Sequence, residues 1–214
     1  MGKLTKLTNA MTVDVEDYFQ VSAFESILPS EKWSSMPIRV EHNTEQILKL
    51  FDDYSVKATF FILGWVAEKR PHLVRAIAKE GHEIASHGFG HKQLHTLSPQ
   101  AFREDCLRSK SFLEDLISQR VLGYRAPTFS LSPKTPWAHP ILEELGFQYS
   151  SSVHPILYDL YGWPDSPRFS YTATPNGLME IPVTTLHKWG RPWPCGGGGY
   201  FRFFLYAYSR WAIK

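Results

Sequence analysis

The feature that most constrains the fold is an alternation of short β-branched or aromatic runs with longer amphipathic segments. Strand-like runs cover residues 11–15, 57–63 and 83–86, helical spacing begins at Asn43, and a second helical segment covers residues 67–79. This order predicts a parallel sheet covered by helices, which is either an open doubly wound sheet or a closed barrel. The periodicity alone does not distinguish the two.

The second half of the chain continues the pattern. Ser98 followed by Pro99 predicts the start of the longest helix. A chain of 214 residues with 43% hydrophobic residues is long enough for one sizeable core, so we predict a single domain. The other expected elements are a helix over residues 140–145, strands over residues 121–127, 147–152 and 179–184, and helical structure over residues 200–214.

Composition narrows the choice of partner and compartment. The formal net charge is +2, with lysine and arginine scattered, which argues against nucleic acid or an acidic membrane surface. Cys106 and Cys195 lack the spacing of a disulfide framework or a zinc knuckle, and we expect buried thiols. There is no run that could cross a bilayer and no secretory signal, so we expect a cytoplasmic chain unless a leader has been removed. The oligomeric state is not defined by the sequence.

Chemically active side chains follow three of the predicted strands. The stretch "DVED" ends the first, "ASHGFGH" the third, and "YRAP" a later one. In both candidate architectures, function gathers at the C-terminal ends of the strands. We therefore predict that these acids, histidines and arginine form one site.

The histidines of that set have metal-ligand spacing. His87 and His91 are four residues apart, and the intervening Gly88 and Gly90 favour a loop in which both rings can reach one divalent ion. One carboxylate from residues 14–17 would complete a triad that leaves metal positions open for water and substrate. The alternatives are a core histidine beside a solvated one, and acids that only begin a helix.

Arg125 is the third part of the predicted site. Pro127 biases Ala126 toward an extended conformation, which holds the arginine on a defined strand end. A guanidinium there can clamp a carboxylate and keep it ionised as a general base. The alternative is a surface arginine that follows a strand.

The three motifs "TVDVED", "GHEIASHGFGH" and "YRAP" together resemble the polysaccharide deacetylases of carbohydrate esterase family four. "GHEIASH" is the most specific of them. The stretches "MEIPVTTL" and "GGGGYFR" resemble more narrowly a branch associated with exopolysaccharide and exosortase loci, near the allantoinase-like deacetylases. The resemblance implies a distorted (β/α) barrel of about seven strands and a divalent metal, most often zinc.

The resemblance also assigns roles within the site. It implies that Asp14 is the catalytic base and that His87 and His91 are metal ligands. The family's commonest metal-binding acid would fall at Val15, so the branch with spaced acids points to Glu16, with Asp17 as the reserve candidate.

Further positions follow from the same resemblance. It implies that Arg125 positions the base and that Pro127 and Thr128 bind substrate, although Thr128 stands where the family often has tyrosine. The family's late histidine general acid has no match, and His187 lies in unmatched surroundings and receives no role. We therefore expect one catalytic domain over residues 1–214 that lacks its C-terminal end.

The expected function is metal-dependent hydrolysis of the N-acetyl amide of a sugar in a polysaccharide or its precursor, with release of acetate. The expected partner is an acetylated glycan. Two alternatives stay open at this point: a small-amide or cyclic-ureide hydrolase of the allantoinase kind, and an inactive member that binds glycan without turnover.

Overall fold

A computed structural model describes residues 9–158 and 161–213 and shows one mostly parallel sheet of seven strands. The strand order is β1-β2-β3-β4-β5-β7-β6, and only the β6–β7 pair is antiparallel. The strands are β1 (Thr12–Val15), β2 (Thr59–Ile62), β3 (Glu83–Ser86), β4 (Gly123–Tyr124), β5 (Tyr149–Ser150), β6 (Tyr171–Thr172) and β7 (Met179–Glu180).

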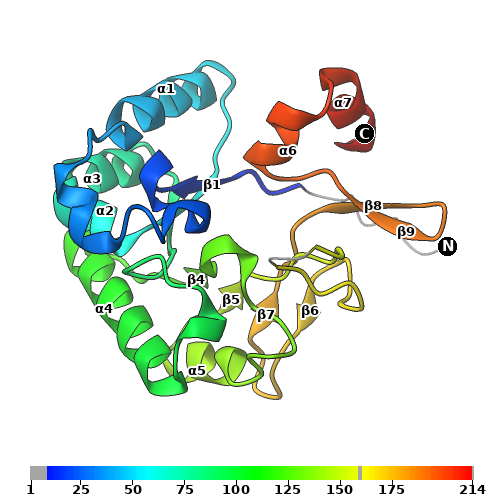
Figure 1. Ribbon diagram of the computed structural model, residues 1–214. Coiled ribbons are helices and arrows are strands. Elements are labelled where there is room, and N and C mark those ends of the chain that lie inside the picture. Colours follow the sequence, from blue (N-terminus) through cyan, green and yellow to red (C-terminus); the bar gives the residue numbers. More distant parts are fainter. Residues whose placement is uncertain (1–8, 159–160, 214) are drawn as a thin grey trace, which may run out of the picture.

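Helices follow most of these strands and form an outer arc around the curved sheet (Figure 1). The first five are α1 (Val40–Asp53), α2 (Gly64–Lys69), α3 (Pro71–Lys79), α4 (Pro99–Ile117) and α5 (Ala138–Glu144). A hairpin of β8 (Thr185–Lys188) and β9 (Arg191–Pro194) forms a second sheet, which is followed by α6 (Gly198–Phe203) and α7 (Tyr206–Ile213). Short 3-10 turns are η1 (Tyr18–Gln20), η2 (Ser22–Phe24), η3 (Ser30–Ser35), η4 (Leu94–Thr96) and η5 (Pro127–Phe129).

The strand order decides between the two architectures that the sequence left open. Strands β1 to β5 are neighbours in chain order, whereas a doubly wound sheet reverses its order at a switch point. The predicted α/β class with about seven strands is therefore confirmed, with the strand succession of a barrel. Within residues 9–158 and 161–213, no pairing joins β1 to β6, so the sheet is not closed by hydrogen bonds there.

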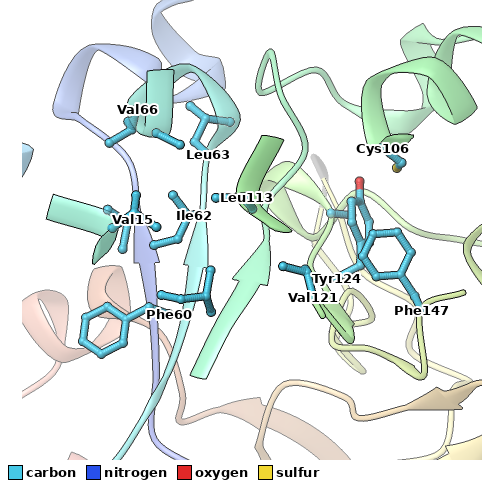
Figure 2. Close-up of a cluster of buried hydrophobic side chains, with 14 of the residues drawn as sticks. Val15, Phe60, Ile62, Leu63, Val66, Cys106, Leu113, Val121, Tyr124 and Phe147 are labelled. Carbon is cyan, nitrogen blue, oxygen red and sulfur yellow. The ribbon is translucent and has the colours of Figure 1, made fainter. Parts of the chain in front are cut away.

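The core lies between the sheet and the helices that cover it (Figure 2). Side chains of β1 and β2 meet there, including Val15, Phe60 and Ile62, all of which are almost fully buried. Each buried side chain of this size contributes about 1.5–3 kcal/mol to folding through apolar burial. This packing fixes the strands in place, and with them the positions of the residues at their C-terminal ends.

Two predicted helix boundaries were wrong. Helix α1 begins at Val40 rather than Asn43, because the Asp17 carboxylate accepts hydrogen bonds from the backbone N–H of Arg39 and Val40. The single helix expected over residues 67–79 is two helices, because Pro71 favours a non-helical conformation at the residue before it and can begin a new helix.

Other expectations agree with the structure. Ser98 caps α4 by accepting a hydrogen bond from Ala101 N–H, and both cysteines are buried free thiols. The C-terminal segment is helical but divided into α6 and α7. Of the helices in the described part of the chain, none has the length and apolar character needed to cross a bilayer.

His154, which follows β5, is a buried histidine in an aromatic environment. Its ring stacks on Tyr161 and meets Phe129 and Tyr200 edge-on, and neither ring nitrogen has a hydrogen-bond partner among the described residues. Burial lowers the pKa of His154 to about 4. In the unfolded chain this imidazole binds a proton near pH 6.5, whereas in the folded protein it stays neutral down to about pH 4. The free energy of unfolding therefore falls as the pH drops from 6.5 to 4.

We expect His154→Phe to remove this pH dependence. Between pH 7.5 and pH 5 the wild type should lose about 2 kcal/mol of unfolding free energy from this group, and the variant should keep it. Urea unfolding of both proteins at the two pH values measures the difference. An equal loss in both would mean that His154 is not held neutral in the folded protein.

Candidate active site

Three side chains from two strand ends converge on one point. Glu16 follows β1, and His87 and His91 follow β3; their ligand atoms all lie within 4.8 Å of one another. Glu16 Oε2 is 2.6 Å from His91 Nε2 and 3.7 Å from His87 Nε2. Two ring nitrogens and one carboxylate are the donor set of an open catalytic zinc site, so these residues fit a divalent ion.

The charges at this point are set by burial and by mutual contact. Burial of Glu16 raises its pKa, but the neighbouring rings of His87 and His91 outweigh that effect and hold the pKa well below its usual range. Burial lowers the pKa of His87, but the carboxylates of Asp14 and Glu16 outweigh it and raise the pKa above its usual value. An anionic carboxylate oxygen thus lies beside the two histidines.

The loop that carries the histidines is held from α4. Asp105 accepts hydrogen bonds from the backbone N–H of Phe89 at 2.7 Å and of Gly90 at 3.1 Å. Gly88 has a φ of +72°, and a Cβ there would lie 2.8 Å from Asp105 Oδ2. The glycine is therefore required both by the left-handed backbone and by the close carboxylate. The predicted loop between the histidines is confirmed.

Asp105→Ala is expected to loosen this loop. Two partly buried N–H groups would lose a charged acceptor, which costs about 2 kcal/mol of unfolding free energy and lets His91 move away from Glu16. Thermal unfolding and zinc affinity, measured beside the exposed control Asp115→Ala, test this. If Asp105→Ala matched the control in both, the loop would not depend on Asp105.

Asp14 lies close enough to His87 to raise the pKa of its ring, and its carboxylate is clamped by Arg125. Arg125 Nη1 donates to Asp14 Oδ1 at 2.7 Å and to Thr12 Oγ1 at 3.0 Å. The guanidinium is buried and lies 4.0 Å from the centre of the Phe61 ring. Arg125 is therefore no surface arginine, and the predicted pairing of a guanidinium with an acid is confirmed.

Ser151 completes the clamp and was not predicted from the sequence. Its carbonyl oxygen accepts from Arg125 Nε at 3.0 Å and its hydroxyl accepts from Arg125 Nη2 at 2.9 Å. The guanidinium is thus held on two sides, by Ser151 directly after β5 and by Thr12 and Asp14 of β1. The serine run after β5 was the only signal, and serines in a loop are too common to single out.

The remaining predicted residues lie around this centre. Asp17, the reserve ligand, is not in the cluster, because its carboxylate already caps η1 and the start of α1. Pro127 and Thr128 lie in η5 directly after the Arg125 strand end, and Thr128 Oγ1 is 2.6 Å from Ser22 Oγ. Thr128 has a left-handed φ of 56°, which is a strained conformation for a β-branched residue.

His187 is exposed on the β8–β9 hairpin, outside the seven-stranded sheet (Figure 1). We therefore assign His187 no role in the candidate site.

The fold and the site define an α/β protein with a candidate three-ligand metal centre and a clamped carboxylate at the strand ends. The chain belongs to the polysaccharide deacetylase family, whose model matches residues 33–150, more than half of the chain. Residues 151–214 match a second family, described as a domain of unknown function. Strand β7, from the second region, pairs with β5 of the first, so both regions contribute to one sheet.

Curated relatives match only part of the chain. A peptidoglycan-N-acetylglucosamine deacetylase of Bacillus cereus is 36% identical over 84 residues, 39% of this chain and 39% of the relative. A chitooligosaccharide deacetylase of a Bradyrhizobium strain is 25% identical over 111 residues, 52% of this chain and 48% of the relative. The matches thus span less than half of the length of these relatives.

Solved structures support the fold. A candidate polysaccharide deacetylase from Mycobacterium smegmatis has a TM-score of 0.63 and 27% identity, with 82% of this chain and 58% of that chain covered. PuuE allantoinase has a TM-score of 0.58 and 24% identity, with 82% of this chain and 61% of the allantoinase chain covered. This similarity shows the fold alone.

Proposed function

We propose that this protein hydrolyses the N-acetyl amide of an N-acetylated sugar in a polysaccharide or its precursor and releases acetate. Family membership and the names of the relatives, which act on peptidoglycan and chitooligosaccharides, support this substrate class. The observation that carries the proposal is the convergence of Glu16, His87 and His91 beside the clamped Asp14. We also propose that residues 1–214 belong to one catalytic domain.

Each side chain has a distinct task in this proposal. Glu16, His87 and His91 would hold a divalent ion, which we propose is zinc and which supplies Lewis acidity toward the acetyl carbonyl. Arg125 binds Asp14 through Oδ1, which leaves Oδ2 to accept a proton from the attacking water. The water oxygen bonds to the acetyl carbon and the carbon–nitrogen bond breaks. The leaving nitrogen takes the proton that Asp14 accepted from the water, so the products are the free amine and acetic acid, which ionises to acetate.

We further propose that the turn of Pro127 and Thr128 faces the substrate. Phe129 and Ser130 donate their N–H groups to backbone carbonyls within the turn. These two hydrogen bonds fix the turn and use the N–H groups of Phe129 and Ser130, so the backbone N–H of Thr128 is the donor that we propose for the oxyanion of the acyl-transfer reaction. The contact between the hydroxyls of Thr128 and Ser22 ties this turn to η2.

The direct test is acetate release from a panel of amides by protein supplied with zinc. The panel contains N-acetylated chitooligosaccharides, peptidoglycan and an acetylated exopolysaccharide. Allantoin, which has no acetyl group, is tested separately by its ring opening to allantoate. Acetate from one of the glycans with none from its de-acetylated form supports the proposal. Hydrolysis of allantoin alone would assign the chain to cyclic ureides, and binding of glycan without turnover would identify an inactive member.

A further inference from the structure

The two histidines of the site differ in how their outer ring nitrogens are satisfied. His87 donates from Nδ1 to the carbonyl oxygen of Arg125 at 2.9 Å, which fixes the ring with Nε2 toward Glu16. His91 also turns Nε2 toward Glu16, but its Nδ1 is buried and has no protein partner among the described residues. Metal-binding histidines almost always donate the second ring N–H to a partner.

Gln20 in η1 carries a second buried group of the same kind. Its Oε1 accepts from the backbone N–H of Asp17 at 2.7 Å, so the oxygen faces that donor and the amide nitrogen faces away. Gln20 is 2% exposed, and its Nε2 has no protein partner in the described part of the chain. An unpaired buried amide donor costs about 1–3 kcal/mol, so a partner is expected.

Gln20 and His91 line the same small cavity. It lies between the η1–η2 segment and residues 90–92 and has a volume of about 10 Å³, which is room for about one water molecule. Its wall also includes Ser22 and Ser30, and the Lys92–Glu25 ion pair of 2.6 Å joins two further lining residues.

We propose that one ordered water in this cavity accepts hydrogen bonds from His91 Nδ1–H and Gln20 Nε2–H, which makes Gln20 a positioning residue for the metal ligand His91. Two donors cannot bond to each other, whereas a water oxygen accepts from both. The hydroxyls of Ser22 and Ser30 offer acceptors for the hydrogens of the water. The inference rests on the metal site of the proposed function.

Zinc affinity tests the link without any measurement of turnover. The dissociation constant is measured by competition with a chromogenic chelator for the wild type, Gln20→Met and Gln20→Glu. Methionine keeps the bulk but removes both polar atoms. Glutamate keeps the acceptor for Asp17 N–H and adds an acceptor on the side of His91. The exposed Gln100→Met on α4 is the matched control.

We expect Gln20→Met to weaken zinc binding about tenfold or more, and Gln20→Glu to stay within about threefold of the wild type or bind more tightly. Unchanged affinity in Gln20→Met would overturn the inference. Equal weakening in both variants would overturn it too, because glutamate keeps the acceptor for Asp17 N–H and adds an acceptor on the side of His91. A crystal structure with a water oxygen at hydrogen-bond distance from both His91 Nδ1 and Gln20 Nε2 supports it. If the wild type binds no zinc at all, the metal site of the proposed function fails instead.

Discussion

Replacement of His87 and His91 together by alanine is expected to remove the metal from the purified protein. Of the three ligand candidates only Glu16 would remain, and a single carboxylate cannot retain a divalent ion through purification. Elemental analysis of wild type purified without chelator should show about one zinc or similar ion per chain, and the double variant less than about a tenth of that. Acetate release should disappear with the metal.

The control is a double alanine variant of His42 and His72, which are both exposed on the surface of the helical arc. It removes the same number of imidazoles without touching the site, so it should keep the wild-type metal content. Equal metal in all three proteins would place the ion elsewhere, and near-zero metal in all three would mean that the loop after β3 holds no ion.

Asp14→Asn is expected to separate metal binding from proton transfer. The amide oxygen can still accept from Arg125 Nη1, so the site should stay folded and loaded, but an amide cannot take a proton from water. We expect unchanged metal content and a fall in acetate release of roughly 10²–10⁴-fold, the usual contribution of a general base.

Steady-state acetate release and elemental analysis on the same preparations measure both quantities. Asp52→Asn, on the exposed end of α1, is the matched control and should resemble the wild type. Full activity in Asp14→Asn would remove Asp14 as the base. Loss of the metal together with activity would show instead that Asp14 supports the ion.

The site could be located from the sequence because it follows from one rule of parallel sheets. Asp14 and Arg125 are 111 positions apart in the chain. Asp14 lies near the C-terminal end of β1 and Arg125 directly follows β4, and the C-terminal ends of parallel strands meet at one edge. The same rule brings Glu16 to His91. The fold class was accessible for a similar reason, since strand and helix periodicities are local signals.

The supporting contacts were not accessible, because they join residues far apart in the sequence without a local pattern. Asp105 holds the histidine loop from a helix 15 and 16 positions later, and Ser151 holds Arg125 from 26 positions later. Asp17 was misassigned for this reason. Its acidic neighbours made it a ligand candidate, while its real partners are the first N–H groups of α1, at residues 39 and 40.

The measurement that tests the central claim most directly is reconstitution of chelator-stripped protein with zinc while acetate release from an N-acetylated chitooligosaccharide is followed. The claim predicts no release from stripped protein, a linear rise with added zinc, and a plateau at about one ion per chain. Release that is unchanged by stripping would contradict a metal-dependent deacetylase built on Glu16, His87 and His91.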